Sequence, residues 1–231
     1  MITVEPWRSR LIVALEGVLT GADPESTHDL RVAAGRLRVY LGLAGWHVLR
    51  PDLRYLRRQA ASLRDYDVAL ARTDLPPELA EFLAAAREMS RAELRTVLIS
   101  PRVTGLSLAL AYLPELPSKE AWRGLPKLVA KVLQRGASLN TPEEWHGLRR
   151  AVRNLRYALE WLGEDTAVLK DLQDALGEMG DLMALLRVSS VFDSVVMAPF
   201  LSSREAELEA NQKSALKAWR KAEPQITDML E

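Results

Sequence analysis

Two short stretches of the chain combine one histidine with several arginines at helical spacing. The first runs from His28 to Arg38, and the second, 118 residues later, runs from His146 to Arg156. At about 100° per helical residue, each histidine and the arginines at the third and tenth positions after it fall within about 80° of one another. Arginine presents a planar fork of donors that matches phosphate oxygens, and it stays charged at any cellular pH. These stripes therefore predict a site for a phosphate-rich anion.

The opposite face of both predicted helices is apolar. Its residues are Leu30, Ala33, Ala34, Leu37 and Leu41 in the first helix, and Leu148, Ala151, Val152, Leu155 and Leu159 in the second. An ordinary amphipathic helix with a solvated polar face is the simpler interpretation, but such a face usually mixes acids with bases. Asp29 is the single acid between His28 and Leu41, and the second stripe has none before Leu159. The scarcity of acids favours an anion site.

The two segments resemble the paired signatures of the CHAD domains, the conserved-histidine α-helical domains. The first signature runs roughly H-x-L-R-V-x-x-R-R-L-R and the second roughly H-x-L-R-x-x-x-K-K-L-R-Y. Supporting motifs follow each of them: LRYLRR at 53–58, RDYDV at 64–68, LQDALG at 172–177, and Asp181. The chain departs from the family pattern at Gly35 and Asn154, where a basic residue is usual, and at Gly180, where Asn is common. The resemblance extends over nearly the whole chain.

The resemblance implies an all-α fold: an internally duplicated helical bundle whose two pseudo-symmetric halves pack around a basic central groove or pore. It also implies non-catalytic binding of inorganic polyphosphate. Basic residues outside the stripes are expected to extend the surface, among them three that share one helix face four residues apart. The predicted polyphosphate-binding residues are His28, Arg31, Arg36, Arg38, Arg57, Arg58, Arg64, Lys127, Lys131, Arg135, His146, Arg149, Arg150, Arg153, Arg156 and Tyr157.

Several of these residues also have a plain structural interpretation. Each histidine either donates to phosphate or makes a structural hydrogen bond, and the Tyr157 hydroxyl either donates or packs at a rim. Arg57, Arg58 and Arg64 extend the basic surface or are simply solvated. Acids stand where the family keeps them, at Asp65, Asp67 and Asp181. We expect these three acids to hold arginine side chains by ion pairs, without a chemical role.

Composition limits the function classes. The 231 residues carry 31 basic and 31 acidic side chains, so the net charge is zero, and any anion site must come from local segregation of charge. The absence of cysteine excludes disulfides and thiolate chemistry and fits a reducing compartment. No apolar run is long enough for a signal peptide core or a membrane span. We therefore expect a cytoplasmic protein without a membrane partner. The family resemblance further implies an association with polyphosphate granules.

Helix boundaries support a duplicated organisation. Asp23 is predicted to cap the first histidine helix, with Pro24 at its first position, and Thr141 is predicted to cap the second, where Thr141 and Glu144 form a T-x-x-E capping box. Each cap precedes its histidine by five residues. A single helix is predicted from Asp52 to about Arg72, and its counterpart from Glu164 to about Val188. We interpret residues 1–231 as one domain made of repeats at about 1–114 and 118–231.

Rival functions follow from the same residues. A nucleic-acid-backbone-binding module would use the same arginines, but it would usually add stacking aromatics and net positive charge. An accessory subunit of a polyphosphate- or triphosphate-processing enzyme is the other alternative. With three histidines and no cysteine, the chain offers no metal cluster, cofactor motif or phosphate-binding glycine loop. We therefore expect no enzyme activity, no metal and no cofactor.

Overall fold

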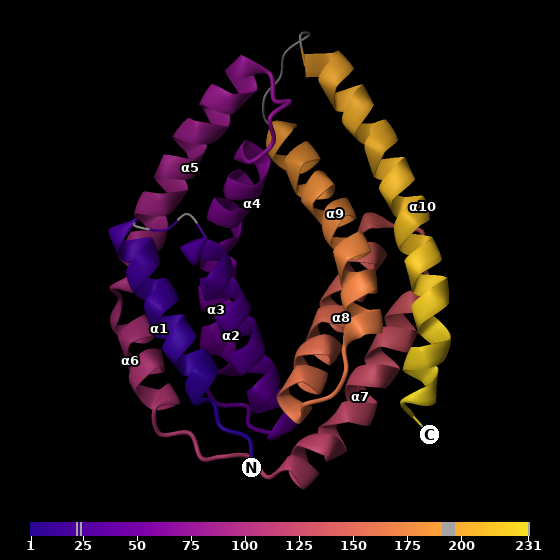
Figure 1. Ribbon diagram of the computed structural model, residues 1–231. Coiled ribbons are helices and arrows are strands. Elements are labelled where there is room, and N and C mark those ends of the chain that lie inside the picture. The colour runs from indigo at the N-terminus through magenta and orange to yellow at the C-terminus, as the bar shows by residue number, and fades with distance from the viewer. Residues whose placement is uncertain (22, 24, 191–196, 231) are drawn as a thin grey trace. The chain divides into compact units, whose positions relative to one another are not determined.

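The computed structural model describes residues 1–21, 23, 25–190 and 197–230, and within them the fold is all-α, as predicted (Figure 1). The helices are α1 (Glu5–Thr20), α2 (Ser26–Leu43), α3 (Arg50–Gln59), α4 (Ala61–Leu70), α5 (Pro77–Leu98), α6 (Pro101–Leu110), α7 (Ser118–Gly136), α8 (Pro142–Leu162), α9 (Ala167–Ser189) and α10 (Ala198–Asp228). Extended pairing in this part of the chain is limited to an isolated bridge between Ile2 and Leu116. None of the described helices combines the length and apolarity that crossing a membrane requires.

The chain forms two compact units, Met1–Ala121 and Trp122–Glu231, and the boundary between them along the chain falls within α7 (Ser118–Gly136). In unit 1, α2 packs against α1 and α3, and α4 packs against α5. The predicted apolar face of α2 is confirmed, because all five of its members are fully buried. The Tyr40 side chain of α2 is also fully buried, and its hydroxyl lies 3.1 Å from the Ile2 carbonyl oxygen and 2.9 Å from that of Pro114. These contacts thus link residues near both ends of unit 1 to α2.

In unit 2, α9 lies between α8 and α10, which both pack against it. The apolar face predicted for α8 is buried as well: Leu148, Val152 and Leu155 are wholly inaccessible, and Ala151 and Leu159 nearly so. Figure 1 shows α10, in yellow, running along the outside of this unit. Each histidine helix therefore has its apolar stripe in the core of its own unit, which leaves the basic stripe on another side.

The two histidine helices begin differently. At α8 the predicted capping box is present: the Thr141 hydroxyl accepts from the Glu144 amide at 3.3 Å, and Glu144 Oε2 accepts from the Thr141 amide at 2.9 Å. At α2 the predicted Asp23 cap is wrong, because the helix starts at Ser26 with Glu25 as its N-cap residue. Asp23 Oδ1 instead accepts from the Glu25 amide at 2.9 Å, which closes a turn just before the helix. Residue 24, predicted as the first helical proline, lies outside the described residues.

The prediction of a single helix from Asp52 to Arg72 is wrong, because the helix is interrupted at Ala60, between α3 and α4. Neither proline nor glycine stands at the break. The Arg31 guanidinium, from α2, donates to the Arg57 carbonyl at 2.8 Å. In an unbroken helix that carbonyl would accept from the amide of residue 61, and a side chain inserted into this ladder is an established cause of a kink. The break is thus explained by a hydrogen bond from Arg31, a residue 26 positions before Arg57 in the chain.

Candidate anion-binding site

The basic stripe of α2 retains much of its predicted arrangement. His28 is exposed, Arg31 and Arg38 are half-buried, and Arg58 of α3 is exposed. Arg64 of α4 is half-buried, and its Nη1 lies 3.4 Å from Glu25 Oε1 in a largely solvent-exposed ion pair. Desolvation of the ring by the surrounding protein and, next, the charge of Arg64 lower the pKa of His28 below 6.5. Arg64 and Arg31 thus bring positive charge to His28, while the carboxylates of Glu25 and Asp29 oppose their effect.

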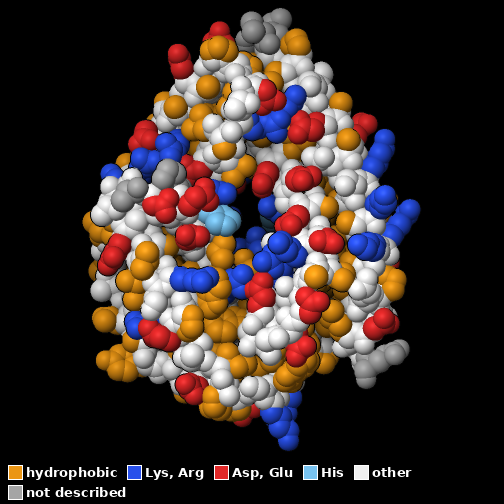
Figure 2. Space-filling model, in the orientation of Figure 1, with side chains coloured by type: hydrophobic (Ala, Val, Ile, Leu, Met, Phe, Trp, Pro, Cys, Tyr) orange, Lys and Arg blue, Asp and Glu red, His pale blue; other side chains and the backbone are white. Residues whose placement is uncertain are grey.

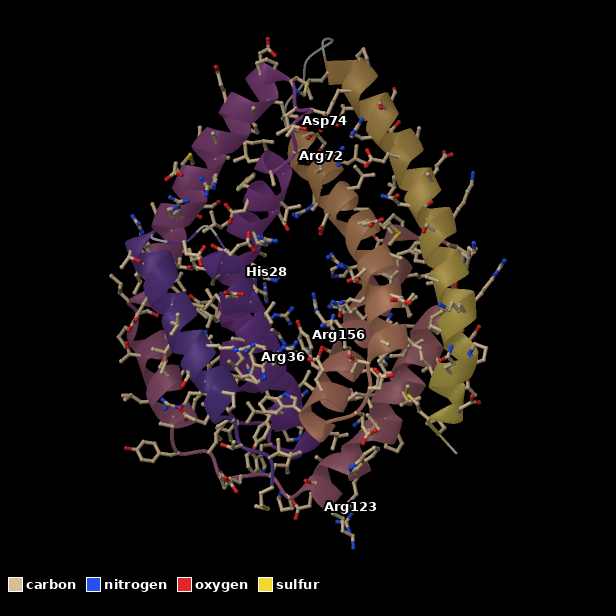
Figure 3. The ribbon with its side chains drawn as sticks, viewed as in Figure 1. His28, Arg36, Arg72, Asp74, Arg123 and Arg156 are labelled. Atoms are coloured by element: carbon tan, nitrogen blue, oxygen red, sulfur yellow. The ribbon has the colours of Figure 1, made fainter. Side chains whose placement is uncertain are left out.

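Arg36 takes a different place on α2. Its guanidinium carbon lies 4.1 Å from the centroid of the Trp7 ring in α1, and Arg10 approaches the same ring at 4.4 Å. Eight residues after His28 correspond to about 80° around the helix, so Arg36 turns toward α1, on the side away from Arg38. Figure 3 labels His28 and Arg36 at these two positions along α2. Arg36 is therefore a cation–π partner of Trp7 and is separated from the stripe that Arg31 and Arg38 form with His28.

Several arginines lie near His146 on α8. Burial comes first among the causes that lower its pKa below 6.5, followed by the charges of Arg150, Arg149, Arg153 and Arg187. The first three arginines belong to the predicted stripe. Arg187 does not: it comes from the last turn of α9, 41 residues after His146, and sequence spacing contained no signal for it. We call His146 and these four arginines the His146 cluster.

Arg149 is fixed by groups on α9. Its Nη2 donates to Asp181 Oδ1 at 3.1 Å, which confirms the expectation that Asp181 holds an arginine. Its guanidinium also lies over Gly180, where a Cβ atom would come within 2.8 Å of the guanidinium carbon. Gly180, the glycine that departs from the family pattern, thus lies directly against an arginine that is predicted to bind the anion.

Other predicted residues have partners of their own. Arg156 Nε donates to Glu160 Oε1 at 2.8 Å, one helical turn along α8. Tyr157 is 5% exposed, so its ring packs inside unit 2. Asp67 accepts from Arg87 Nε at 2.6 Å, an ion pair of the kind expected for it. Arg156 and Tyr157 therefore take more part in packing than the sequence predicted.

The three basic residues predicted on one face of α7 differ in exposure. Lys127 and Lys131 are exposed, and the Lys131 ammonium donates to Gln134 Oε1 at 2.8 Å. Arg135 is half-buried and lies against Gly147 of α8, where an added Cβ would be 3.3 Å from its Cδ. Gly147 follows His146 directly, so Arg135 reaches the beginning of the His146 cluster, whereas the two lysines lie further back along α7.

The surface of unit 2 carries charges of both signs. Figure 2 shows Lys and Arg side chains where α8 and α9 lie, with Asp and Glu side chains among them, and both signs also occur along α10. Arg123 of α7 extends into solvent away from the helices (Figure 3). Among the described residues, no group of three or more His, Asp or Glu side chains is arranged to hold a metal ion.

These features define an all-α protein with two histidine-led arginine clusters, one in each unit. The family model of the CHAD domain matches residues 6–188, which is most of the chain, so the protein belongs to the CHAD-domain family. The crystal structure of the CHAD domain from the plant Ricinus communis is similar, with a TM-score of 0.74 and 24% identity over 95% of this chain and 88% of that one. PptA from Streptomyces chartreusis has a TM-score of 0.63 and 18% identity over 99% of this chain and all of that one. No curated protein matches the chain.

Proposed function

We propose that this protein binds inorganic polyphosphate without cleaving it, and that the His146 cluster and the basic stripe of α2 supply the contacts. The observation that carries the proposal is that four arginines lie close enough to His146 for their charges to lower its pKa, in a chain of zero net charge. Like charges held together are unfavourable unless an anion joins them. The family resemblance, through its link to polyphosphate, supports the same ligand.

The chemistry of polyphosphate suits these clusters. The polymer carries about one negative charge per phosphate, and a planar guanidinium can donate two parallel hydrogen bonds to phosphate oxygens. Ten residues of helix, as from His28 to Arg38, span about 15 Å, which exceeds the length of a single phosphate group. Each stripe is therefore matched to a run of phosphates, and binding needs no reacting group. The basic groove or pore between the halves remains a prediction from the sequence.

A nucleic acid backbone offers similar charges and is the principal alternative. Single-stranded nucleic acids are commonly held by aromatic side chains that stack on bases. Near the proposed sites, Tyr157 is buried and the Trp7 ring is covered by Arg10 and Arg36. No observation favours an accessory role in a triphosphate-processing enzyme over simple binding.

Calorimetric titration of the purified chain with long-chain polyphosphate tests the proposal. We expect binding at low salt that weakens steeply at high salt, because bound cations are released. Arg150→Glu/Arg153→Glu should weaken binding by more than tenfold. Lys213→Glu/Lys217→Glu on α10 makes the same change in net charge outside the clusters and should have a much smaller effect. Absence of binding at low salt, or equal losses in both variants, would exclude the proposed sites.

Two further assays separate the alternatives. Polyphosphate should displace single-stranded RNA of equal phosphate content, whereas the reverse order of preference would favour the nucleic-acid module. Release of orthophosphate from polyphosphate in the presence of magnesium should be absent, and its appearance would make the protein an enzyme. A cytoplasmic location at polyphosphate granules is part of the proposal, and imaging of a fluorescent fusion in granule-containing cells tests it.

A further inference from the structure

Gly180 lies in the middle of α9, where a glycine is unfavourable. Relative to alanine, a glycine inside a helix destabilises it, because glycine loses more backbone freedom on folding. The residue has an ordinary helical conformation, since the positive φ values of the described glycines belong to Gly21, Gly45 and Gly163. The backbone of α9 therefore gives no reason for glycine at this position.

The reason lies in the neighbouring side chain. A Cβ atom on Gly180 would stand 2.8 Å from Cζ and 3.1 Å from Nε of Arg149, and closer still to Nη1. These atoms are the far end of a flexible side chain from α8, and no backbone atom of α8 is among the three nearest. An alanine at this position could be accommodated if Arg149 moved away, without separating the two helices. Glycine at this position thus affects where the guanidinium lies more than how α8 and α9 pack.

The guanidinium also has a second contact that fixes its direction. Arg149 Nη2 donates to Asp181 Oδ1 at 3.1 Å, and Asp181 directly follows the glycine on α9. Arg149 and Asp181 side chains are 27% and 48% exposed, so the ion pair alone holds the arginine weakly. The gap left by the missing Cβ supplies the remaining constraint.

We propose that Gly180 is a positioning residue of the phosphate site, whose missing side chain forms the slot that holds the Arg149 guanidinium within the His146 cluster. The role in phosphate binding rests on the proposed function. The existence of the slot does not rest on that function, because the slot determines where the charge of Arg149 lies in the protein without ligand.

A matched pair of variants tests the slot. Gly180→Ala fills it, while Gly177→Ala makes the same change one helical turn earlier on α9, where an added Cβ would meet no atom within 4 Å. Both proteins should keep the helical circular-dichroism signal and melt at the wild-type temperature or above it. The pKa of His146, followed by NMR titration without ligand, should rise in Gly180→Ala because Arg149 moves away, and should stay at the wild-type value in Gly177→Ala.

Binding gives an independent measurement. Polyphosphate affinity should fall about threefold to tenfold in Gly180→Ala and remain unchanged in Gly177→Ala, in line with displacement of one charged donor. In an Arg149→Ala background, Gly180→Ala should cause no further loss. An unchanged His146 pKa in Gly180→Ala, or failure of that variant to fold, would overturn the slot. If the wild-type protein does not bind polyphosphate but the pKa of His146 still rises in Gly180→Ala, the proposed function is wrong and the slot is confirmed.

Discussion

The guanidinium of Arg149 and the carboxylate of Asp181 form an ion pair across α8 and α9, with Nη2 and Oδ1 3.1 Å apart. The corresponding arginine of α2, Arg31, donates to the carbonyl of Arg57. The Asp181 carboxylate competes with an incoming phosphate for the Arg149 guanidinium. The charge of Asp181 therefore affects how easily Arg149 can turn to a ligand.

Replacing Asp181 with asparagine should tighten polyphosphate binding. The substitution removes the competing charge while Gly180 still leaves room for Arg149. A partly exposed ion pair contributes up to about 1 kcal/mol, which corresponds to an increase in affinity of up to about fivefold. Calorimetric titration at low salt measures the change. Asp171→Asn on the same helix, where the carboxylate lies 3.8 Å from Lys221 Nζ, is the control and should change affinity less. Weaker binding by Asp181→Asn would mean that the carboxylate orients Arg149 productively.

Polyphosphate binding should take up protons. The pKa values of His28 and His146 lie below 6.5 in the free protein, through burial and nearby arginines. A bound anion raises both values, so the complex holds more protons than the free protein near pH 6.5, and affinity should increase as pH falls through this range. Calorimetry in two buffers of different ionisation enthalpy counts the protons. The His28→Gln/His146→Gln variant should lose most of the uptake, and full retention would place the titrating groups elsewhere.

The same lowered pKa values determine how stability depends on pH without ligand. Because the unfolded chain binds these protons at higher pH than the folded protein, the histidines reduce the free energy of unfolding as pH falls below 6.5, down to the folded pKa values. Urea unfolding of wild type should show this decrease, and polyphosphate should reduce it. The double glutamine variant should show a smaller decrease over the same pH range.

The Thr141 cap should contribute to the stability of unit 2. Thr141→Ala removes the acceptor for the Glu144 amide and should lower the free energy of unfolding by about 1 kcal/mol, measured by urea titration of the helical signal. Thr166 is the N-cap residue of α9, but its side chain makes no capping hydrogen bond. Thr166→Ala should therefore have a smaller effect, and equal losses would argue against a specific capping contribution.

Gly136 should not tolerate a side chain. It is buried at the end of α7, where an added Cβ would overlap the ring of Trp219 from α10, and Trp219 is 3% exposed. Gly136→Ala should destabilise the protein by about 1–3 kcal/mol, because neither the ring nor the helix can move freely. Gly105→Ala on α6, where nothing lies within 4 Å of the added Cβ, should be neutral or stabilising by up to about 1 kcal/mol. Thermal unfolding of both variants compares them directly.

The sequence predicted those features that depend on local periodicity. The apolar stripes of α2 and α8 are buried as predicted, because side chains repeating every three or four residues share one helix face. The Thr141 capping box was predictable because all of its atoms lie within four residues. The ion pair between Arg149 and Asp181 was anticipated in part, through the family resemblance.

Features that depend on contacts between distant residues could not be predicted from the sequence. The break at Ala60 reflects a donor on α2, and Arg187 joins the His146 cluster from another helix. Arg36 has the same residue type and nearly the same spacing as its neighbours, yet its position on the helix circumference brings it to Trp7. The type and spacing of the basic residues therefore did not show which of them would contact residues of other helices.

The fastening of Ile2 to Leu116 has a topological consequence for unit 1. Their backbones exchange hydrogen bonds of 2.8 and 2.9 Å, and the Tyr40 hydroxyl lies within hydrogen-bond distance of the Ile2 and Pro114 carbonyl oxygens. The chain thus enters and leaves these helices at one point, as is common in domains that tolerate circular permutation. In unit 1 by itself, a short peptide could join these two positions, and new termini could open in the loop between α4 and α5 while α1 to α6 kept their neighbours.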